Sequence, residues 1–120
     1  VRDKAMFKKI MAVHPYSKML AEADCAIVVC GNTKREMAPG YWQADCGAAT
    51  QNILLAATAL GIGSVWLGVY PNAERMEAVS RLLNLPEYVK PLNIISLGMP
   101  AEKLAEVNRF DPAKIHYELW

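Results

Sequence analysis

The glycines at positions 61, 63 and 68 are the residues of this chain whose type and spacing most suggest chemistry. Gly61 and Gly63 lie two residues apart, and Gly68 follows an apolar run that contains Trp66. Glycines spaced in this way bind phosphate when they join a strand to the N-terminus of a helix. Here they follow a helical pattern and precede a strand pattern, and Trp66 stands where the third glycine of the G-x-G-x-x-G pattern belongs. A helix C-terminus carries partial negative charge and repels phosphate, so a nucleotide-binding glycine loop is excluded.

Each of these glycines also has a structural interpretation. Gly61 is predicted to end a helix in the left-handed conformation, and Gly63 to complete the turn into the next strand. Gly68 falls inside a predicted strand, where a glycine weakens the strand unless another group approaches its backbone. The spacing leaves two alternatives open at this strand: a ligand contact at Gly68, or core packing by its neighbours Trp66 and Leu67.

The other side chains that could take part in catalysis or binding lack suitable partners nearby in the sequence. Cys46 has no histidine close to it, so core packing is favoured over a role as a nucleophile. His14 precedes Pro15 and is predicted to be a turn residue, with an acid–base role as the minor alternative. Arg109 is either solvated or an anion contact. The three cysteines and two histidines show no metal-ligand spacing, so neither a catalytic side chain nor a metal site is predicted.

The bulk composition narrows the class of protein. A chain of 120 residues with 53% hydrophobic and 21% charged residues predicts one globular domain, residues 1–120. The net charge of +1 gives no electrostatic footprint for a nucleic acid or an anionic membrane surface. The longest apolar stretch, residues 53–60, is too short to span a bilayer. Unpaired thiols and the lack of a targeting motif lead us to expect a cytoplasmic protein.

The elements that must position these residues alternate along the chain. Helical patterns cover residues 3–13, 17–23, 41–61 and 72–85, and strand patterns cover residues 25–30, 64–70 and 92–98. The first two strands are continuous apolar runs, which predicts burial on both faces and, with the alternation, an α/β domain with a parallel sheet. Helix 41–61 is apolar almost all round in its last two turns and carries small residues in its first half. We therefore expect it to be buried inside the domain or at a subunit interface.

Four segments carry a resemblance that runs nearly from end to end of the chain. They are HPYSKMLAEADCAIVVCGN, YWQADCGAATQNILLAATALGIGSVWLGVYP, LLNLPEYVKPLNIISLGMPAEK and NRFDPAKIHYELW. Together, in this order, they resemble the nitroreductase family of flavin enzymes. The resemblance implies an α+β fold with a mostly antiparallel sheet flanked by helices, in place of the parallel sheet. It also implies a homodimer whose long central helices, residues 41–61, pack together and hold FMN at the interface.

The resemblance also implies which residues bind. The family's pattern places one stretch of backbone along the flavin ring, with an N–H donated to flavin N5: Trp66, Leu67, Gly68 and Val69. Arg109 matches the basic residue that contacts the FMN phosphate, and Lys103 is a weaker match for the same role. Tyr41 and Trp42, at the start of the long helix, would line the substrate side.

The activity implied by the resemblance is an FMN-dependent NAD(P)H oxidoreductase. Hydride would pass from the nicotinamide to flavin N5, and an electron-poor small molecule, such as a nitroaromatic or a quinone, would then take the reducing equivalents in a ping-pong scheme. The flavin carries the redox chemistry and the protein supplies position and electrostatics. No side-chain nucleophile is required, in agreement with the residues.

One part of the family's pattern is not among these residues. Members open with an Arg-x-Ser-x-Arg segment that grips the FMN phosphate and ribityl chain, and residues 1–120 contain none. FMN binding is expected where such a segment precedes Val1, whereas a protein without it lacks several charge-assisted hydrogen bonds. Two alternatives follow: a non-catalytic, dimerising remnant that has lost flavin binding, or a flavin-remodelling or dehalogenating relative on the same scaffold.

Overall fold

Helices and strands alternate along the chain, as the sequence predicts. The computed structural model describes residues 1–102 and 105–120. The elements are α1 (Lys4–Val13), the 3-10 helix η1 (Lys18–Ala21), β1 (Cys25–Asn32), α2 (Trp42–Ala59), β2 (Gly63–Gly68), α3 (Ala73–Leu82), β3 (Val89–Gly98) and the 3-10 helix η2 (Pro112–Lys114).

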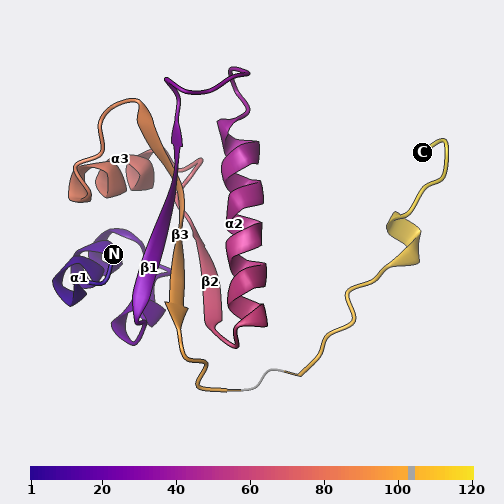
Figure 1. Ribbon diagram of the computed structural model, residues 1–120, viewed down its shortest axis with the longest axis horizontal. Helices are drawn as coiled ribbons and strands as arrows, with labels where there is room; N and C mark the ends of the chain where they lie inside the picture. The colour runs from indigo at the N-terminus through magenta and orange to yellow at the C-terminus, as the bar shows by residue number, and fades with distance from the viewer. Residues whose placement is uncertain (103–104) are drawn as a thin grey trace.

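The three strands form one antiparallel sheet in the order β1-β3-β2. Helices α1 and α3 cover one face and α2 lies against the other, so the fold is α+β in three layers (Figure 1). The parallel sheet expected from the alternation is wrong, and the antiparallel sheet implied by the resemblance is confirmed. The reason is topological. Strands β1 and β2 run in the same direction, but β3 lies between them and runs the opposite way.

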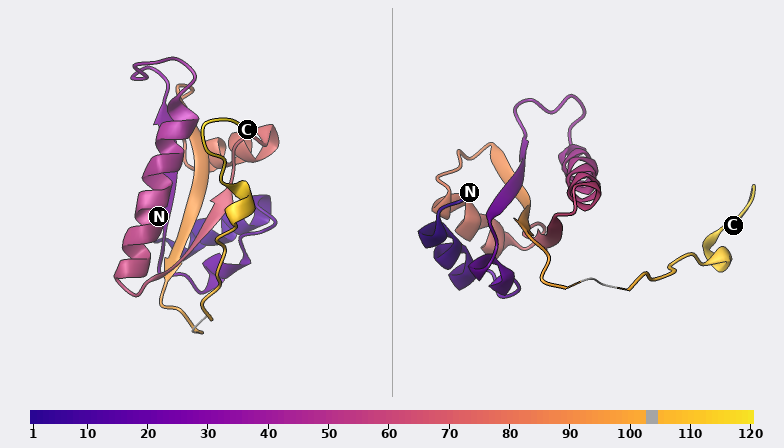
Figure 2. Two further views of the ribbon diagram at one scale, coloured as in Figure 1. Left: turned by 90° about the vertical axis from the view of Figure 1, so that its right-hand side faces the viewer. Right: turned by 60° about the horizontal axis from the view of Figure 1, so that its bottom comes forward.

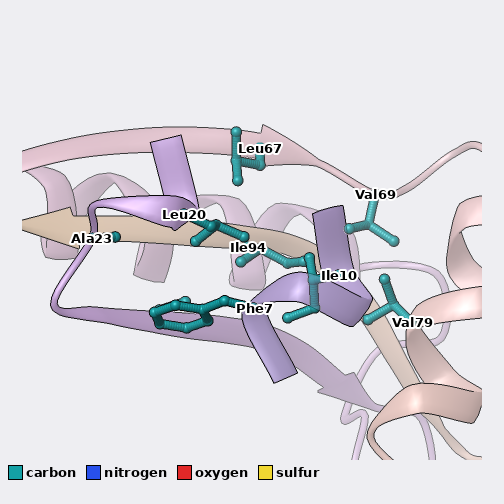
Figure 3. Packing of buried hydrophobic residues seen from close by; sticks show 9 residues of the cluster. Phe7, Ile10, Leu20, Ala23, Leu67, Val69, Val79 and Ile94 are labelled. Carbon is teal, nitrogen blue, oxygen red and sulfur yellow. The ribbon is translucent and has the colours of Figure 1, made fainter. Parts of the chain in front are cut away.

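The apolar core lies between the sheet and helices α1 and α3. Figure 3 shows side chains from both helices, from η1 and from the strands pointing toward one another. The buried cluster consists of Phe7, Ile10, Leu20, Ala23, Ala26, Leu67, Val69, Val79 and Ile94. Burying one large apolar side chain of this kind contributes about 1.5–3 kcal/mol, so this cluster fixes the position of β2 against the two helices.

Helix ends are set by local side chains, and the end that the sequence predicts at Gly61 is confirmed. The side chain of Asp3 accepts a hydrogen bond from the Ala5 N–H at the start of α1, and Asn72 accepts one from the Arg75 N–H at the start of α3. Gly61 has φ +71°, the left-handed conformation that ends α2. Gly63 has ordinary φ and is the first residue of β2, where a Cβ would lie 3.2 Å from the Gly98 carbonyl oxygen. Close packing therefore explains Gly63 better than turn geometry.

Two expectations about burial and one about a helix differ from the structure. The outer side of the last two turns of α2 is exposed, with Leu55 58% accessible, because α2 packs on the sheet along one side only. Burial inside the domain therefore holds for one side of α2, and its place at a subunit interface stays a prediction. Strands β1 and β2 are not buried on both faces, since Ile27 is 39% and Trp66 42% accessible. The helix predicted over residues 17–23 is the shorter η1, and Ser17 makes no capping bond to it.

The C-terminal segment, residues 105–120, lies away from the body of the fold (Figures 1 and 2). It contains one short helical turn, η2, at whose start the Asp111 side chain accepts a hydrogen bond from the Ala113 N–H. Every residue of the segment is exposed. Its large apolar side chains are Val107, Phe110, Ile115, Tyr117, Leu119 and Trp120.

Candidate functional site

The C-terminal end of β2 is an open sheet edge with backbone groups directed outward. Strand β2 is the last strand of the sheet, and Gly68 lies opposite Asn93 of β3. The N–H of Val69 donates to the Leu92 carbonyl oxygen at 3.1 Å. In an antiparallel pair this makes Gly68 a residue that is not hydrogen-bonded to its partner, so its own N–H and C=O point away from β3. An N–H is thereby presented at the open edge.

The face of Gly68 above this edge is also open. A Cβ built on Gly68 would meet nothing within 4 Å. The side chain of Asn93, on the same face, donates to the Thr50 hydroxyl of α2 at 2.8 Å, which identifies this as the α2 face. Trp66 lies two residues before Gly68 and therefore on the same face, with 42% of its surface accessible. A flat ligand can approach the backbone here beside an exposed indole.

The neighbouring residues Leu67 and Val69 point the other way, into the core. They are 3% and 0% accessible, so they can reach a ligand only through their backbone. The structure thus separates the four predicted ring-contacting residues into two kinds: Trp66 and Gly68 offer an accessible surface, and Leu67 and Val69 anchor the strand.

The carbonyl oxygen of Gly68 is held by two side chains. His14 Nε2 lies 2.9 Å from it and Arg75 Nη1 donates to it at 3.3 Å. His14 ends α1, as the predicted turn at Pro15 requires, but it is 2% accessible and contacts a residue 54 positions away. Sequence reasoning missed this contact, and no spacing in the sequence signals it.

The structure brings Trp42 close to this strand end. The Trp42 and Tyr70 rings meet edge to face at 5.1 Å between centroids. The indole also packs on Gly31, where a Cβ would come within 2.7 Å of it. Glu36 Oε1 accepts a hydrogen bond from the Trp42 N–H at 2.8 Å, which fixes the start of α2. Tyr41, one residue earlier, is 63% accessible. The aromatic side chains of Trp42 and Tyr70 therefore lie next to the end of β2.

The two predicted phosphate contacts are not brought to this edge by the chain itself. Arg109 lies in the exposed C-terminal segment, away from the body of the fold (Figure 1). Lys103 lies outside the described residues.

The thiols of Cys30 and Cys46 are poor nucleophiles in this environment. Burial, with a smaller effect of the nearby Cys46, raises the pKa of Cys30 to about 11. Burial, and then the Asp45 carboxylate, also raises the pKa of Cys46. Both thiols are protonated at neutral pH, and Cys46 is buried as the packing interpretation predicts. Within residues 1–102 and 105–120, no group of three or more His, Cys, Asp or Glu side chains is arranged to hold a metal ion.

Among the helices of the described residues, none combines the length and apolar character needed to cross a membrane.

The site at the end of β2 offers an outward N–H, an open glycine face and aromatic neighbours, which together suit the positioning of a flat ligand.

The fold and this edge define a small α+β domain, and the chain belongs to the nitroreductase family, whose profile matches residues 2–99. It is 49% identical over 120 residues to a protein of Methanothermobacter thermautotrophicus that is named as a proposed NADH dehydrogenase/NAD(P)H nitroreductase. A protein of the same name in Archaeoglobus fulgidus is 48% identical over 124 residues.

Solved structures share the fold closely. A crystal structure of a Bacteroides thetaiotaomicron protein, with the same proposed activity in its name, superposes with a TM-score of 0.94 at 45% identity. All of this chain is covered in these three comparisons. It spans 63% and 71% of the two archaeal relatives and 70% of the Bacteroides chain.

Proposed function

We propose that this chain forms the core of an FMN-dependent oxidoreductase that uses NAD(P)H as its hydride donor. The observation that carries the proposal is the end of β2, where the backbone edge and the open face of Gly68 are accessible. Membership of the nitroreductase family and the NAD(P)H nitroreductase names of the relatives support the same activity.

The residues at this edge fit a flavin. An isoalloxazine ring is flat and has a hydrogen-bond acceptor at N5. A backbone N–H can donate to that atom, and a residue without a Cβ leaves room for the ring. The outward N–H of Gly68 and its missing Cβ meet these two requirements. When bound there, FMN would supply a hydride acceptor and pass the reducing equivalents on to an electron-poor molecule. The chain's own part is to hold the ring, with Trp66 and Gly68 beside it and Leu67 and Val69 anchoring the strand.

The acceptor that we propose is a nitroaromatic, a quinone or a similar electron-poor compound. Aromatic side chains stack well on electron-poor rings, and Tyr41 and Trp42 provide them. Trp42 is held between Gly31 and Tyr70, and Tyr41 is exposed beside it. Donor and acceptor would occupy the same face in turn, which is a ping-pong scheme.

A homodimer is the assembly that we propose. The side of α2 that turns away from the sheet is exposed. It carries small and apolar residues beside a few polar ones (Asp45, Gln51, Asn52 and Thr58), and the small and apolar ones include Ala44, Ala48, Ala49, Leu55, Ala56 and Ala59. Small residues let a second helix approach closely, so two copies of α2 can pack together. In such a dimer, the apolar C-terminal segment would also have a second copy to pack against.

The proposed phosphate contacts, Arg109 and Lys103, depend on this assembly. Arg109 lies on the segment that extends from the body. It reaches the phosphate of an FMN bound at β2 once the segment folds back or packs on a second copy. Three free cysteines suit a reducing compartment, which favours the cytoplasm.

The test is whether the intact protein binds flavin and exchanges hydride with it. The purified protein should be yellow, and anaerobic addition of NADH or NADPH should bleach the visible flavin absorbance. A nitroaromatic or quinone should then restore it. A colourless protein that also fails to take up added FMN would overturn the proposal and favour a non-catalytic dimer. Products formed from the flavin itself, without an added acceptor, would indicate a flavin-remodelling enzyme.

A further inference from the structure

The Gly68 carbonyl oxygen has an unusual environment for a group on an open sheet edge. It accepts hydrogen bonds from His14 Nε2 at 2.9 Å and from Arg75 Nη1 at 3.3 Å. A carbonyl oxygen has two lone pairs, so both are used. The two donors come from different helices, since His14 follows α1 and Arg75 lies in α3. The edge is thus fixed from two sides at one atom.

His14 is itself held firmly in place. It is 2% accessible, and its N–H donates to the Ile10 carbonyl oxygen at 3.0 Å. Its own carbonyl oxygen accepts from the Ser17 hydroxyl at 2.6 Å. Because Gly68 offers a carbonyl, Nε2 must carry the ring proton, while Nδ1 is buried without a partner. The bond to Gly68 is therefore the one hydrogen bond that the imidazole makes.

Arg75 approaches the same oxygen from the first turn of α3. Its backbone N–H donates to the Asn72 side chain at 2.9 Å, which anchors the residue. Its guanidinium carbon lies 5.4 Å from the centre of the Tyr16 ring, two residues beyond His14. The turn after α1 and the start of α3 therefore meet at the end of β2.

We infer that His14 and Arg75 are positioning residues for the ligand contact at Gly68. This inference rests on the proposed function. A glycine leaves room for a flat ring, but it also gives the backbone more conformational freedom than any other residue. Two hydrogen bonds to its carbonyl oxygen restrict that freedom and hold the outward N–H of the same residue in one direction. Neither side chain needs to touch the ligand.

The test compares variants that remove each hydrogen-bond donor with one that replaces the donor and one that leaves both donors in place. His14→Phe removes the imidazole donor, and His14→Gln places an amide N–H near the position of Nε2. Arg75→Met removes the guanidinium. The matched control is Arg81→Met on the same helix, because Arg81 is exposed and forms a surface ion pair with Glu77 at 3.7 Å. The readouts are the 15N resonance of FMN labelled at N5 and the FMN dissociation constant, both measured on the intact protein.

In His14→Phe and Arg75→Met we expect the N5 resonance to move and FMN binding to weaken about two- to tenfold, the size of effect that a single intramolecular hydrogen bond has. His14→Gln should return both values toward those of the unmodified protein, and Arg81→Met should leave them unchanged. Should His14→Phe fail to fold, Arg75→Met decides, because Arg75 is half-exposed and its loss opens no buried cavity.

Two contrary outcomes are distinguishable. If the unmodified protein binds FMN while His14→Phe and Arg75→Met keep its N5 resonance, the positioning role is overturned and the proposed function stands. If the unmodified protein gives no bound FMN signal, the proposed function fails and the inference fails with it.

Discussion

At the scale of single residues, the site depends on what Gly68 lacks. The open face and the outward N–H belong to one residue, and its neighbours Leu67 and Val69 hold the strand in the core. A side chain at Gly68 would therefore fill the space where the ligand is proposed to lie, and it would not clash with other protein atoms. Binding and stability can be separated at this position.

Gly68→Ala is expected to weaken FMN binding without weakening the fold. A Cβ there meets no atom within 4 Å and φ is ordinary, so the new methyl group causes no strain in the free protein. Alanine also costs about 0.5–1 kcal/mol less than glycine inside a strand, so the free energy of unfolding should stay level or rise. Urea denaturation and FMN titration measure the two effects, and we expect the dissociation constant to rise at least about tenfold, or about 1.4 kcal/mol.

Gly63→Ala is the matched control on the same strand. Its Cβ would lie 3.2 Å from the Gly98 carbonyl oxygen and 3.5 Å from Pro100, so the backbone has to shift. This variant should lose stability and keep its affinity for FMN. An unchanged FMN dissociation constant in Gly68→Ala would show that no ligand lies over this glycine.

At the scale of elements, the sequence predicts the local structure and not the pairing. Helix ends follow from local preferences: the end predicted at Gly61 is confirmed, and the Asn72 side chain caps the start of α3. Strand direction depends on how distant segments meet, and alternation alone suggested the wrong sheet. Burial inside the domain was overestimated for β2 and for the outer side of α2. An apolar run shows that a surface needs a partner, but it does not say whether the same chain or a second copy supplies that partner.

The candidate site was predictable only in part for the same reason. Family resemblance pointed to Trp66–Val69, and the register of β2 against β3 explains why Gly68 and Trp66 are the accessible members. The contacts of His14 and Arg75 with Gly68 join three elements, so no local pattern predicts them. The phosphate contact of Arg109 remains a prediction, since it requires the C-terminal segment to pack against the body of the fold or a second copy.

Asn72→Ala should destabilise the domain by about 1 kcal/mol. The Asn72 side chain caps α3 by accepting the Arg75 N–H at 2.9 Å, and loss of such a cap costs roughly 0.5–2 kcal/mol. Helix α3 contributes Val79 to the core, so fraying of α3 reduces the stability of the whole domain. Urea denaturation monitored by circular dichroism measures the change.

Asp111→Ala provides the comparison for this cap. Asp111 makes the same kind of bond, accepting the Ala113 N–H at 3.1 Å, but η2 lies outside the packed body. Its loss should leave the unfolding midpoint unchanged. Equal effects of the two substitutions would mean that the C-terminal segment is part of the cooperative fold.

At the scale of the whole molecule, one protomer leaves two apolar surfaces without cover. The outer face of α2 exposes Leu55 at 58%, and Leu60, just after the helix, is 75% accessible. The C-terminal segment exposes Phe110 at 71% and Trp120 at 100%. Contiguous apolar surfaces of this kind mark interfaces more often than they face water. Both surfaces come from the same chain, so a second copy is the simplest partner.

If two copies pack along α2 as proposed, Leu55→Glu should shift the protein from that dimer to monomer. Leucine and glutamate have similar helix propensities and Leu55 is exposed in the protomer, so α2 itself should be retained. In a dimer packed along α2 the new carboxylate would be buried without a partner, which is costly. Sedimentation equilibrium should show the dimer dissociation constant raised at least about tenfold, or about 1.4 kcal/mol. Ala12→Glu, at an exposed position of α1, should leave the dimer intact. Because FMN is proposed to lie at the interface, Leu55→Glu should also release the flavin, and a monomer that keeps its FMN would contradict that placement.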